Sequence, residues 1–270
     1  MPRSASHAMT VLADSYDAFL FDLDGVLYRG TEVVPGAPEA IARLRSAGKH
    51  VAFVTNNSGR TPDAVAGVLN GFGISATPAE VETSALVTAH ELASRGVSEV
   101  FVVGEEGILS ALRDAGIAIA GAGANRTEAV VVGWDRRVDY EKLCRASILV
   151  QRGAVLFATN ADASYPAADG NWPGAGALLA AVETTTGAHA EVFGKPEAPI
   201  MLAALDRAGG GTPLVIGDRL ETDIAGAAAL GWDSLLVLTG ITRRDDLAGS
   251  QIVPTFVGDD LSALFAPPAP

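Results

Sequence analysis

The stretch from Ala18 to Tyr28 constrains the fold of this chain more than any other part of the sequence. It begins with Ala-Phe-Leu-Phe, a short apolar run typical of strands that are buried on both faces of a sheet. Asp22, Asp24 and Gly25 follow directly. Because side chains at positions i and i+2 of an extended chain point the same way, we expect the two carboxylates to project together from the end of this strand.

Two carboxylates this close repel each other unless a cation lies between them or one of them is protonated. The pair therefore predicts either a hard metal ion, or a nucleophile and a proton carrier that share one site. Our hypothesis combines both. The carboxyl end of a buried strand is also where open parallel α/β sheets bind their ligands.

The rest of the chain alternates apolar runs with segments of helical periodicity, which is the βαβ pattern of a parallel sheet. Further strands are predicted at 51–54, 100–103, 129–132, 155–158, 213–216 and 234–238. Helices are predicted at about 38–45, 62–70, 84–95, 140–151, 177–185, 197–208 and 221–230. Residues 163–176, rich in Pro, Gly, Asn and Asp, are predicted to form an ordered loop.

This rhythm predicts an α/β protein with a Rossmann-like parallel-sheet core and a large inserted α/β cap domain. The sheet is predicted in two sections. Residues 1–96 and 188–270 would form the catalytic core, and residues 97–187 would form the cap.

Composition limits the kinds of partner that the chain can have. It carries 19 Lys and Arg against 32 Asp and Glu, a formal charge of −13, which disfavours nucleic acid and anionic membrane surfaces. No apolar run approaches the length of a membrane span. The single cysteine and the absence of a signal-peptide pattern predict a reducing, cytoplasmic location.

Polar clusters lie at four predicted strand ends. They are Asp22 with Asp24, Thr55 with Asn56, Lys195, and Asp218 with Asp223. Each alone has an ordinary explanation as a turn, a cap or a solvated charge. Because the carboxyl ends of parallel strands meet at one edge of a sheet, the four clusters together predict one shared site.

Other nucleotide and metal motifs do not fit. The Gly-x-Gly segments at 121–126 and 174–179 lack the third glycine of a dinucleotide fingerprint. Gly194-Lys195 lacks the earlier glycine of a P-loop, and the four histidines show no zinc-ligand spacing.

The chain resembles the haloacid dehalogenase (HAD) superfamily over about residues 16–260. Its four motifs are matched by Asp22-x-Asp24-Gly25-Val26, Thr55-Asn56-Asn57, Gly194-Lys195-Pro196 and Gly217-Asp218-x-x-x-x-Asp223. The insert resembles that of the capped branch, subclass IIA, which includes NagD-like and p-nitrophenyl phosphatase-like enzymes. Supporting runs are Gly133-Trp134-Asp135-Arg136, Tyr140-Glu141-Lys142-Leu143, and Thr159-Asn160-x-Asp162 followed by Pro173-Gly174-x-Gly176.

The resemblance implies a Mg²⁺-dependent phosphomonoester hydrolase that works through an aspartyl-phosphate. It implies that Asp22 is the nucleophile and that Asp24 carries the proton. The carboxylates of Asp22 and Asp218 and the backbone carbonyl of Asp24 would hold Mg²⁺. Asp223 would hold a metal-bound water or orient Lys195.

The resemblance also implies how the phosphoryl group is bound. Lys195 would offer a compact positive charge, and Thr55 a hydroxyl. Backbone N–H groups near Asn56 and Asn57 would bind the remaining phosphoryl oxygens.

The predicted loop of the cap supplies candidates for contact with the leaving group. They are Asn160, Asp162, Tyr165, Asn171 and Trp172. Trp172 would narrow the pocket, and the scarcity of basic residues in this loop favours a small or medium monophosphate.

Glycerol 3-phosphate or phosphoglycolate is therefore the expected substrate, with a nucleoside monophosphate or pyridoxal phosphate as the alternative. Asp24 favours ester hydrolysis, because proton-transferring aspartates at this position are typical of phosphatases and mutases. A phosphotransferase or mutase, and a binding protein on an inactive fold, stay open as further hypotheses. Related capped phosphatases suggest a homodimer through the cap.

Overall fold

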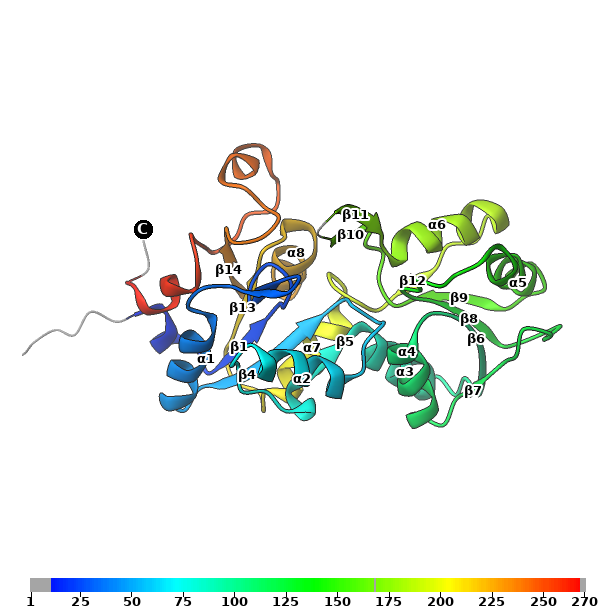
Figure 1. The fold of residues 1–270 in the computed structure, drawn as a ribbon, viewed down its shortest axis with the longest axis horizontal. Helices are drawn as coiled ribbons and strands as arrows, with labels where there is room; N and C mark the ends of the chain where they lie inside the picture. The colour runs from blue at the N-terminus through cyan, green and yellow to red at the C-terminus, as the bar shows by residue number, and fades with distance from the viewer. Residues whose placement is uncertain (1–10, 168, 268–270) are drawn as a thin grey trace, which may run out of the picture.

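The computed structural model describes residues 11–167 and 169–267, whose strands form two larger sheets (Figure 1). The core sheet has the strand order β15-β14-β13-β1-β4-β5, and all its pairs are parallel. Its strands are Ala18–Phe21 (β1), His50–Thr55 (β4), Val81–Thr83 (β5), Pro213–Gly217 (β13), Asp233–Val237 (β14) and Phe256–Gly258 (β15). The predicted parallel α/β core is confirmed.

The second sheet has the order β12-β9-β8-β6-β7 and is also parallel. Its strands are Glu99–Val103 (β6), Ala118–Ile119 (β7), Ala129–Val132 (β8), Val155–Ala158 (β9) and Glu191–Val192 (β12). We propose that this sheet is the centre of the cap. Because β12 pairs with β9, we propose to extend the cap from residue 187 to residue 192.

Most helices agree closely with the sequence pattern up to residue 207, but the helix Glu106–Asp114 was not predicted. The helices are Ala37–Ser46 (α1), Pro62–Gly71 (α2), Ser84–Ser94 (α3), Glu106–Asp114 (α4), Tyr140–Gln151 (α5), Ala175–Thr186 (α6), Ala198–Arg207 (α7) and Ala225–Ala229 (α8). The helix predicted at 221–230 is instead a π-helical turn, Leu220–Ile224, that leads into the short α8. Within the described residues, no helix combines the length and the apolar character that crossing a bilayer requires.

The prediction of a loop at 163–176 is wrong. Ser164–Ala167 (β10) and Gly170–Pro173 (β11) form an antiparallel hairpin, and α6 begins directly after it. Each of these strands contains a proline, which usually argues against a strand. In a two-stranded ribbon, some backbone N–H groups of each strand point outward and make no hydrogen bond to the partner strand. A proline at such a position removes no hydrogen bond between the strands, so the hairpin accepts these prolines. A second hairpin, Tyr28–Arg29 (β2) with Glu32–Val33 (β3), follows the Asp22 segment.

Strand β1 shows why the core sheet is buried on both faces. Phe19 and Phe21 pack with α1 and α2 on one side, whereas Ala18 and Leu20 pack with α3 and α7 on the other. All four side chains are at most 1% exposed. This alternation fixes which residues after the strand can project from its end.

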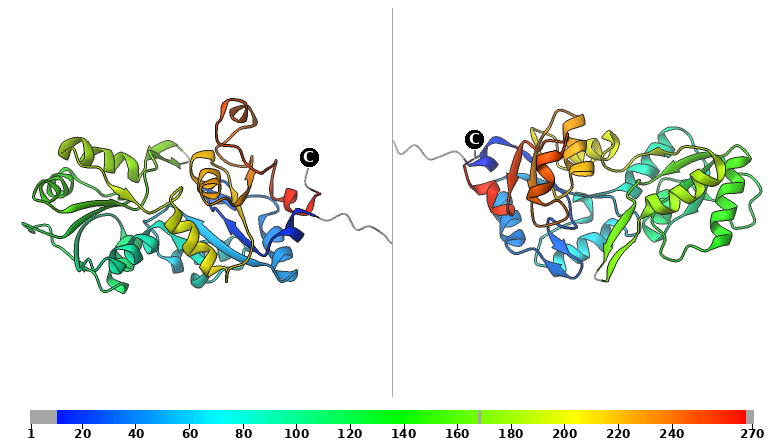
Figure 2. Two further views of the ribbon diagram at one scale, coloured as in Figure 1. Left: turned by 180° about the vertical axis from the view of Figure 1, so that it is seen from behind. Right: turned by 90° about the horizontal axis from the view of Figure 1, so that it is seen from above.

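One apolar cluster connects the two sheets. It contains Leu20 and Val54 of the core sheet as well as Val102 and Val131 of the second sheet. Helices α3 and α4 contribute to the same cluster, and α5 and α6 cover the other face of the second sheet. The molecule is therefore elongated, with one sheet in each half (Figures 1 and 2).

Candidate active site

Three of the predicted clusters lie side by side at one edge of the core sheet. Strand β1 pairs in register with β4 on one side and with β13 on the other, so Asp22, Thr55 and Asp218 lie at adjacent strand ends. The backbone N–H of Asp22 continues this pairing by donating to the carbonyl of Ile216 at 2.8 Å. The parallel topology thus brings together residues that are far apart in the sequence.

A pocket at this edge collects most of the residues predicted from the sequence. Those that line it are Asp22, Asp24, Thr55, Asn56, Asn57, Asn160, Asp162, Tyr165, Lys195 and Asp223. Six further lining residues were not predicted as site residues: Trp134, Ser164, Gly174, Ala175, Arg219 and Thr222. We call this cavity the catalytic pocket.

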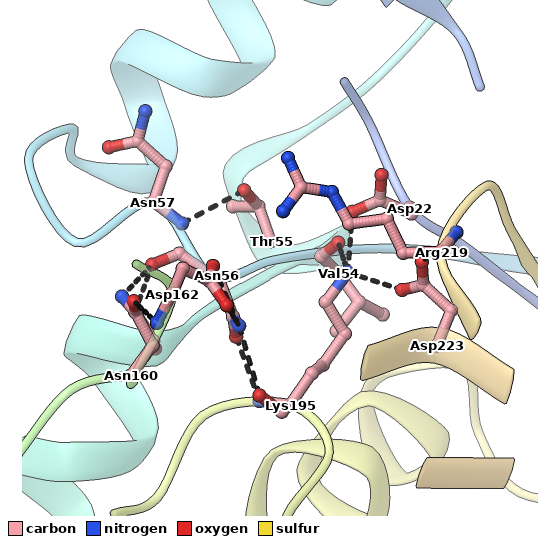
Figure 3. Close-up of polar contacts among 11 residues, drawn as sticks. Asp22, Val54, Thr55, Asn56, Asn57, Asn160, Asp162, Lys195, Arg219 and Asp223 are labelled. Carbon is pink, nitrogen blue, oxygen red and sulfur yellow. Dashed lines mark hydrogen bonds and ion pairs between the residues drawn. The ribbon is translucent and has the colours of Figure 1, made fainter. Parts of the chain in front are cut away.

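Lys195 lies between two buried carboxylates (Figure 3). Its Nζ donates to Asp22 Oδ1 at 2.5 Å and to Asp223 Oδ1 at 2.6 Å. Burial by itself would lower the pKa of the Lys195 ammonium, but the two carboxylates raise it above its ordinary value. Burial raises the pKa of Asp22 well above its usual range, and the Lys195 charge opposes this effect. Lys195 is therefore a fixed cation that favours ionised Asp22.

Asp218 completes a group of three carboxylates. One oxygen each from Asp22, Asp218 and Asp223 lies within 4.8 Å of the other two. Asp218 Oδ2 accepts a hydrogen bond from the backbone N–H of Ile241 at 2.7 Å, but its buried Oδ1 has no partner among the described residues. Burial, followed by the charge of Asp223, raises the pKa of Asp218 to about 6. An unpaired buried oxygen in an all-carboxylate group fits a hard divalent cation such as Mg²⁺.

Two glycines make room for Asp218. A Cβ atom at Gly25 or at Gly240 would overlap with Asp218 Oδ2. Gly25 also has φ +90°, a conformation that residues with a side chain rarely adopt. The glycine of the Asp-x-Asp-Gly motif is therefore required both by its own turn and by its close approach to the carboxylate.

Asp24 lies in the catalytic pocket, but its carboxyl is not part of the three-carboxylate group. Burial raises the pKa of Asp24, against the smaller opposing effects of Arg60, Lys195 and Arg219. A raised pKa favours the protonated carboxyl. The environment of Asp24 therefore suits a group that donates a proton.

Asn56 links three parts of the site through its side chain. Its Nδ2 donates to Lys195 O at 3.0 Å and to Asp162 Oδ2 at 3.1 Å, and its Oδ1 accepts from Lys195 N at 2.8 Å. The Asn56 carbonyl accepts from Asn160 Nδ2 at 2.6 Å. Asn160 and Asp162, both predicted to contact the leaving group, thus join the segment after β9 to the turn after β4 (Figure 3).

The turn after Thr55 uses its polar groups internally. Asn57 N donates to Thr55 Oγ1 at 3.1 Å, and Asn57 Oδ1 accepts from Gly59 N at 2.9 Å. The N–H of Asn57, predicted to bind a phosphoryl oxygen, therefore has a partner within its own turn in this structure.

Trp134 and Tyr165 are the aromatic residues that line the catalytic pocket. Their ring centroids are 4.5 Å apart, and Trp134 Nε1 donates to Pro173 O at 3.2 Å. Trp172, predicted to narrow the pocket, does not line it: its side chain is 42% exposed and its Nε1 donates to Asp169 Oδ1 at 2.8 Å. Asn171 is likewise exposed and outside the pocket.

The unpredicted residues carried only a weak signal in the sequence. Trp134 follows the apolar run of β8 by two positions, so the end of that strand indicated its place. Arg219 is one of the four residues that the motif leaves unspecified between Asp218 and Asp223, and only the three-dimensional structure reveals its neighbours.

A parallel core whose strand ends carry these carboxylates beneath a second α/β sheet defines a capped HAD-fold hydrolase. The chain belongs to this family: residues 19–118 match the model described as haloacid dehalogenase-like hydrolase, and residues 192–264 match a HAD-hydrolase-like model.

Close relatives carry the names of phosphatases. The 5'-nucleotidase YutF of Bacillus subtilis is 38% identical over 251 residues, covering 92% of this chain and 97% of that protein. The acid sugar phosphatase of Staphylococcus aureus is 37% identical over 254 residues, covering 93% of this chain and 97% of that protein. The predicted class of enzyme is thus confirmed: the chain is a phosphatase of the HAD family.

The fold also matches solved structures of phosphatases. The glycerol phosphate phosphatase from Mycobacterium tuberculosis, in complex with magnesium, superposes with a TM-score of 0.90 at 36% identity, covering 95% of this chain and 78% of that chain. The p-nitrophenyl phosphatase from Archaeoglobus fulgidus gives 0.85 at 33%, covering 92% and 98%. The subclass IIA resemblance is confirmed, and the predicted Mg²⁺ cofactor agrees with the magnesium complex.

Proposed function

We propose that this chain hydrolyses phosphate monoesters of small metabolites through an aspartyl-phosphate at Asp22, with Mg²⁺ as cofactor. The placement of Asp22 carries the proposal. Its carboxylate bonds to Lys195 at 2.5 Å in the pocket that Thr55 and Asp24 also line. A buried carboxylate with a fixed cation and a neighbouring proton donor is suited to nucleophilic attack on phosphorus.

Mg²⁺ would be held by the carboxylates of Asp22 and Asp218 and by the backbone carbonyl of Asp24, with Asp223 nearby. When bound, it supplies positive charge that stabilises the phosphoryl oxygens. The unpaired Oδ1 of Asp218 supports this assignment.

The side chains divide the chemical steps between them. A carboxylate oxygen of Asp22 forms a bond to phosphorus while the bond from phosphorus to the leaving oxygen breaks, and Asp24 gives its proton to the departing alkoxide. Water then attacks phosphorus and passes a proton to Asp24, while the bond from phosphorus to the Asp22 oxygen breaks. This step releases phosphate and restores the Asp22 carboxylate. Lys195 and Thr55 hold the phosphoryl oxygens during both steps.

The substrate is proposed from pocket size and from the relatives. The catalytic pocket has a volume of about 70 Å³, which suits a phosphoryl group with little else. We propose glycerol 3-phosphate or phosphoglycolate, in line with the mycobacterial glycerol phosphate phosphatase. A nucleoside monophosphate is the alternative supported by the B. subtilis nucleotidase, and pyridoxal phosphate is a further candidate. A homodimer through the cap and a cytoplasmic location stay predictions.

The test is phosphate release from a panel of these esters and p-nitrophenyl phosphate, with Mg²⁺ or with EDTA. The proposal expects Mg²⁺-dependent release that Asp22→Asn abolishes. Added alcohols distinguish a phosphotransferase, which would transfer phosphate to them instead of releasing it. Near-native turnover by Asp22→Asn would refute the nucleophile, and EDTA-resistant turnover would refute the metal.

A further inference from the structure

Arg219 lines three cavities. Besides the catalytic pocket, it lines a cavity of about 390 Å³ beside the β2–β3 hairpin and another of about 410 Å³ next to residues 192–197. We call the first of these the hairpin cavity and the second the lateral cavity. Among the described residues, Arg219 alone lines all three.

The hairpin cavity is the one that adjoins the proton donor. Asp24 lines both the catalytic pocket and the hairpin cavity, but it does not line the lateral cavity. A leaving-group oxygen must lie within hydrogen-bond reach of the carboxyl that protonates it. Because Asp24 lines both cavities, an alcohol that it protonates can extend from the catalytic pocket toward the hairpin cavity. The position of Asp24 selects the hairpin cavity.

Two arginines and three acidic residues line the hairpin cavity. Arg29 of β2 and Arg219 both line it, as does Ala167 at the end of β10. In the described part of the chain, neither guanidinium makes a hydrogen bond or an ion pair. Arg219 is only partly exposed, whereas Arg29 lies at the exposed rim. A partly buried guanidinium without a partner provides a planar fork of donors for an anionic group.

The acidic residues of the cavity leave this charge available. Asp24 is the proposed proton donor, and Asp218 belongs to the proposed metal group. Glu32 lies opposite Arg29 in the β2–β3 register and lines the cavity, but the two side chains form no ion pair. Arg219 is therefore the stronger candidate for contact with an anion, and Arg29 the weaker one.

We propose, building on the phosphatase function above, that the hairpin cavity is the subsite for the leaving group and that Arg219 selects its charge. The preferred substrates are then phosphate monoesters whose alcohol carries a second negative group, such as a carboxylate. This places a carboxylate-bearing ester such as phosphoglycolate ahead of glycerol 3-phosphate.

A matched pair of esters tests this selectivity. In 3-phosphoglycerate a carboxylate replaces the terminal CH₂OH of glycerol 3-phosphate, while the rest of the molecule is the same. We expect the wild-type enzyme with Mg²⁺ to have a higher kcat/KM for 3-phosphoglycerate. In Arg219→Gln the ratio of the two kcat/KM values should fall by about tenfold to a hundredfold, mainly through KM, since a hydrogen bond to a charged group is lost.

Further variants separate selectivity from general damage. Arg219→Lys should keep part of the preference, and Arg29→Gln should reduce it by a smaller factor. Arg113→Gln is the control, because Arg113 pairs with Glu106 on the exposed face of α4, outside all three cavities. Circular dichroism and thermal melting check that each variant is folded.

Two results would overturn the inference while leaving the phosphatase function intact. One is a wild-type enzyme that hydrolyses both esters equally well or prefers glycerol 3-phosphate. The other is an Arg219→Gln variant that loses both activities by the same factor, which would indicate a structural role. If the wild-type enzyme with Mg²⁺ hydrolysed neither ester nor p-nitrophenyl phosphate, the proposed function itself would fail and the inference with it.

Discussion

Lys195 shows at the scale of one residue how an acidic protein can build a site for an anion. It is 4% exposed and lies between Asp22 and Asp223, whose side chains are 11% and 2% exposed. Burying charges is costly unless each has a partner, so the three groups depend on one another. The family resemblance implied Lys195 and its pairing with Asp223, and the fold adds the distances that join its ammonium to both carboxylates.

Replacement of Lys195 by Met should therefore reduce stability as well as activity. Without the cation, two buried carboxylates would face each other unpaired, and we expect a loss of about 3–5 kcal/mol in the free energy of unfolding. Denaturant unfolding measures this loss. Arg244→Met, which breaks the exposed Arg244–Asp259 pair, is the control and should cost at most about 1 kcal/mol. Equal losses in the two variants would contradict this account of Lys195.

Asp162 allows a test of pH dependence away from the metal group. Burial raises its pKa above the ordinary value of 3.8, whereas Asn56, Arg219 and Lys195 lower it and Asp223 raises it. The folded state therefore binds more protons than the unfolded state from about pH 3.8 up to the raised pKa. Stability contributed by this carboxyl is complete below that window and is lost as the pH rises through it.

Asp162→Asn removes this titration but keeps an oxygen that can accept from Asn56. We expect the stability of the variant relative to wild type to increase as the pH rises from about 4 to about 7. Urea unfolding of both proteins at several pH values provides the comparison. A stability difference that stays constant over this range, or that shifts toward wild type, would show that burial does not dominate at Asp162.

At the scale of the element, the β10–β11 hairpin decides which aromatic residue reaches the pocket. Tyr165 and Trp172 lie directly opposite each other in the hairpin, yet only Tyr165 lines the catalytic pocket. The sequence could not predict which aromatic residue lines the pocket. The prolines argue against strands at both segments, and the register of the hairpin follows from its turn. Tyr165 is fixed by its contact with Trp134, which comes from a different strand end.

The two aromatic residues therefore form a matched pair for mutagenesis. Tyr165→Ala should raise KM by roughly twofold to tenfold, the range expected for the loss of an aromatic contact. Trp172→Ala should change KM by less than about twofold, since Trp172 is partly solvent-exposed. Steady-state kinetics with p-nitrophenyl phosphate would measure KM for both variants and for the wild type. A larger effect at Trp172 would restore the role predicted for it from the sequence.

The shortness of several strands limited the prediction of the fold more than the chemistry of the site limited the prediction of its residues. The apolar runs of β1, β4 and β13 are continuous and were readily assigned to strands, whereas β5, β12 and β15 have only two or three residues. Part of the segment predicted as a helix at 221–230 is a π-helical turn that contains Asp223. Sequence periodicity therefore identified the strands that carry the proposed catalytic groups, and tertiary contacts determined the remaining geometry.

At the scale of the whole molecule, one metal would join strand ends from both halves of the core sheet. Asp22 follows β1, Asp218 follows β13 and Asp223 lies in the next turn, and one carboxylate oxygen of each lies within 4.8 Å of the other two. A cation that binds only the folded state stabilises the whole domain. The surplus of acidic residues strengthens this expectation, because the chain carries a formal charge of −13.

Addition of Mg²⁺ should therefore raise the melting temperature. At a concentration about 100 times Kd, the gain in free energy of unfolding should be about 2.7 kcal/mol. Differential scanning calorimetry with Mg²⁺ and with EDTA measures the shift. Asp218→Asn should reduce it strongly, whereas Asp259→Asn, at an exposed position, should leave it unchanged. An equal shift in wild type and Asp218→Asn would place the metal elsewhere.

The central claim is that Asp22 becomes phosphorylated during turnover. Borohydride reduces an acyl phosphate to the alcohol, so trapping during hydrolysis of p-nitrophenyl phosphate should convert Asp22 to homoserine, as mass spectrometry of the peptides would show. We predict this conversion at Asp22 only when both ester and Mg²⁺ are present. Rapid turnover with unmodified Asp22, or with the modification at Asp24, would contradict the account.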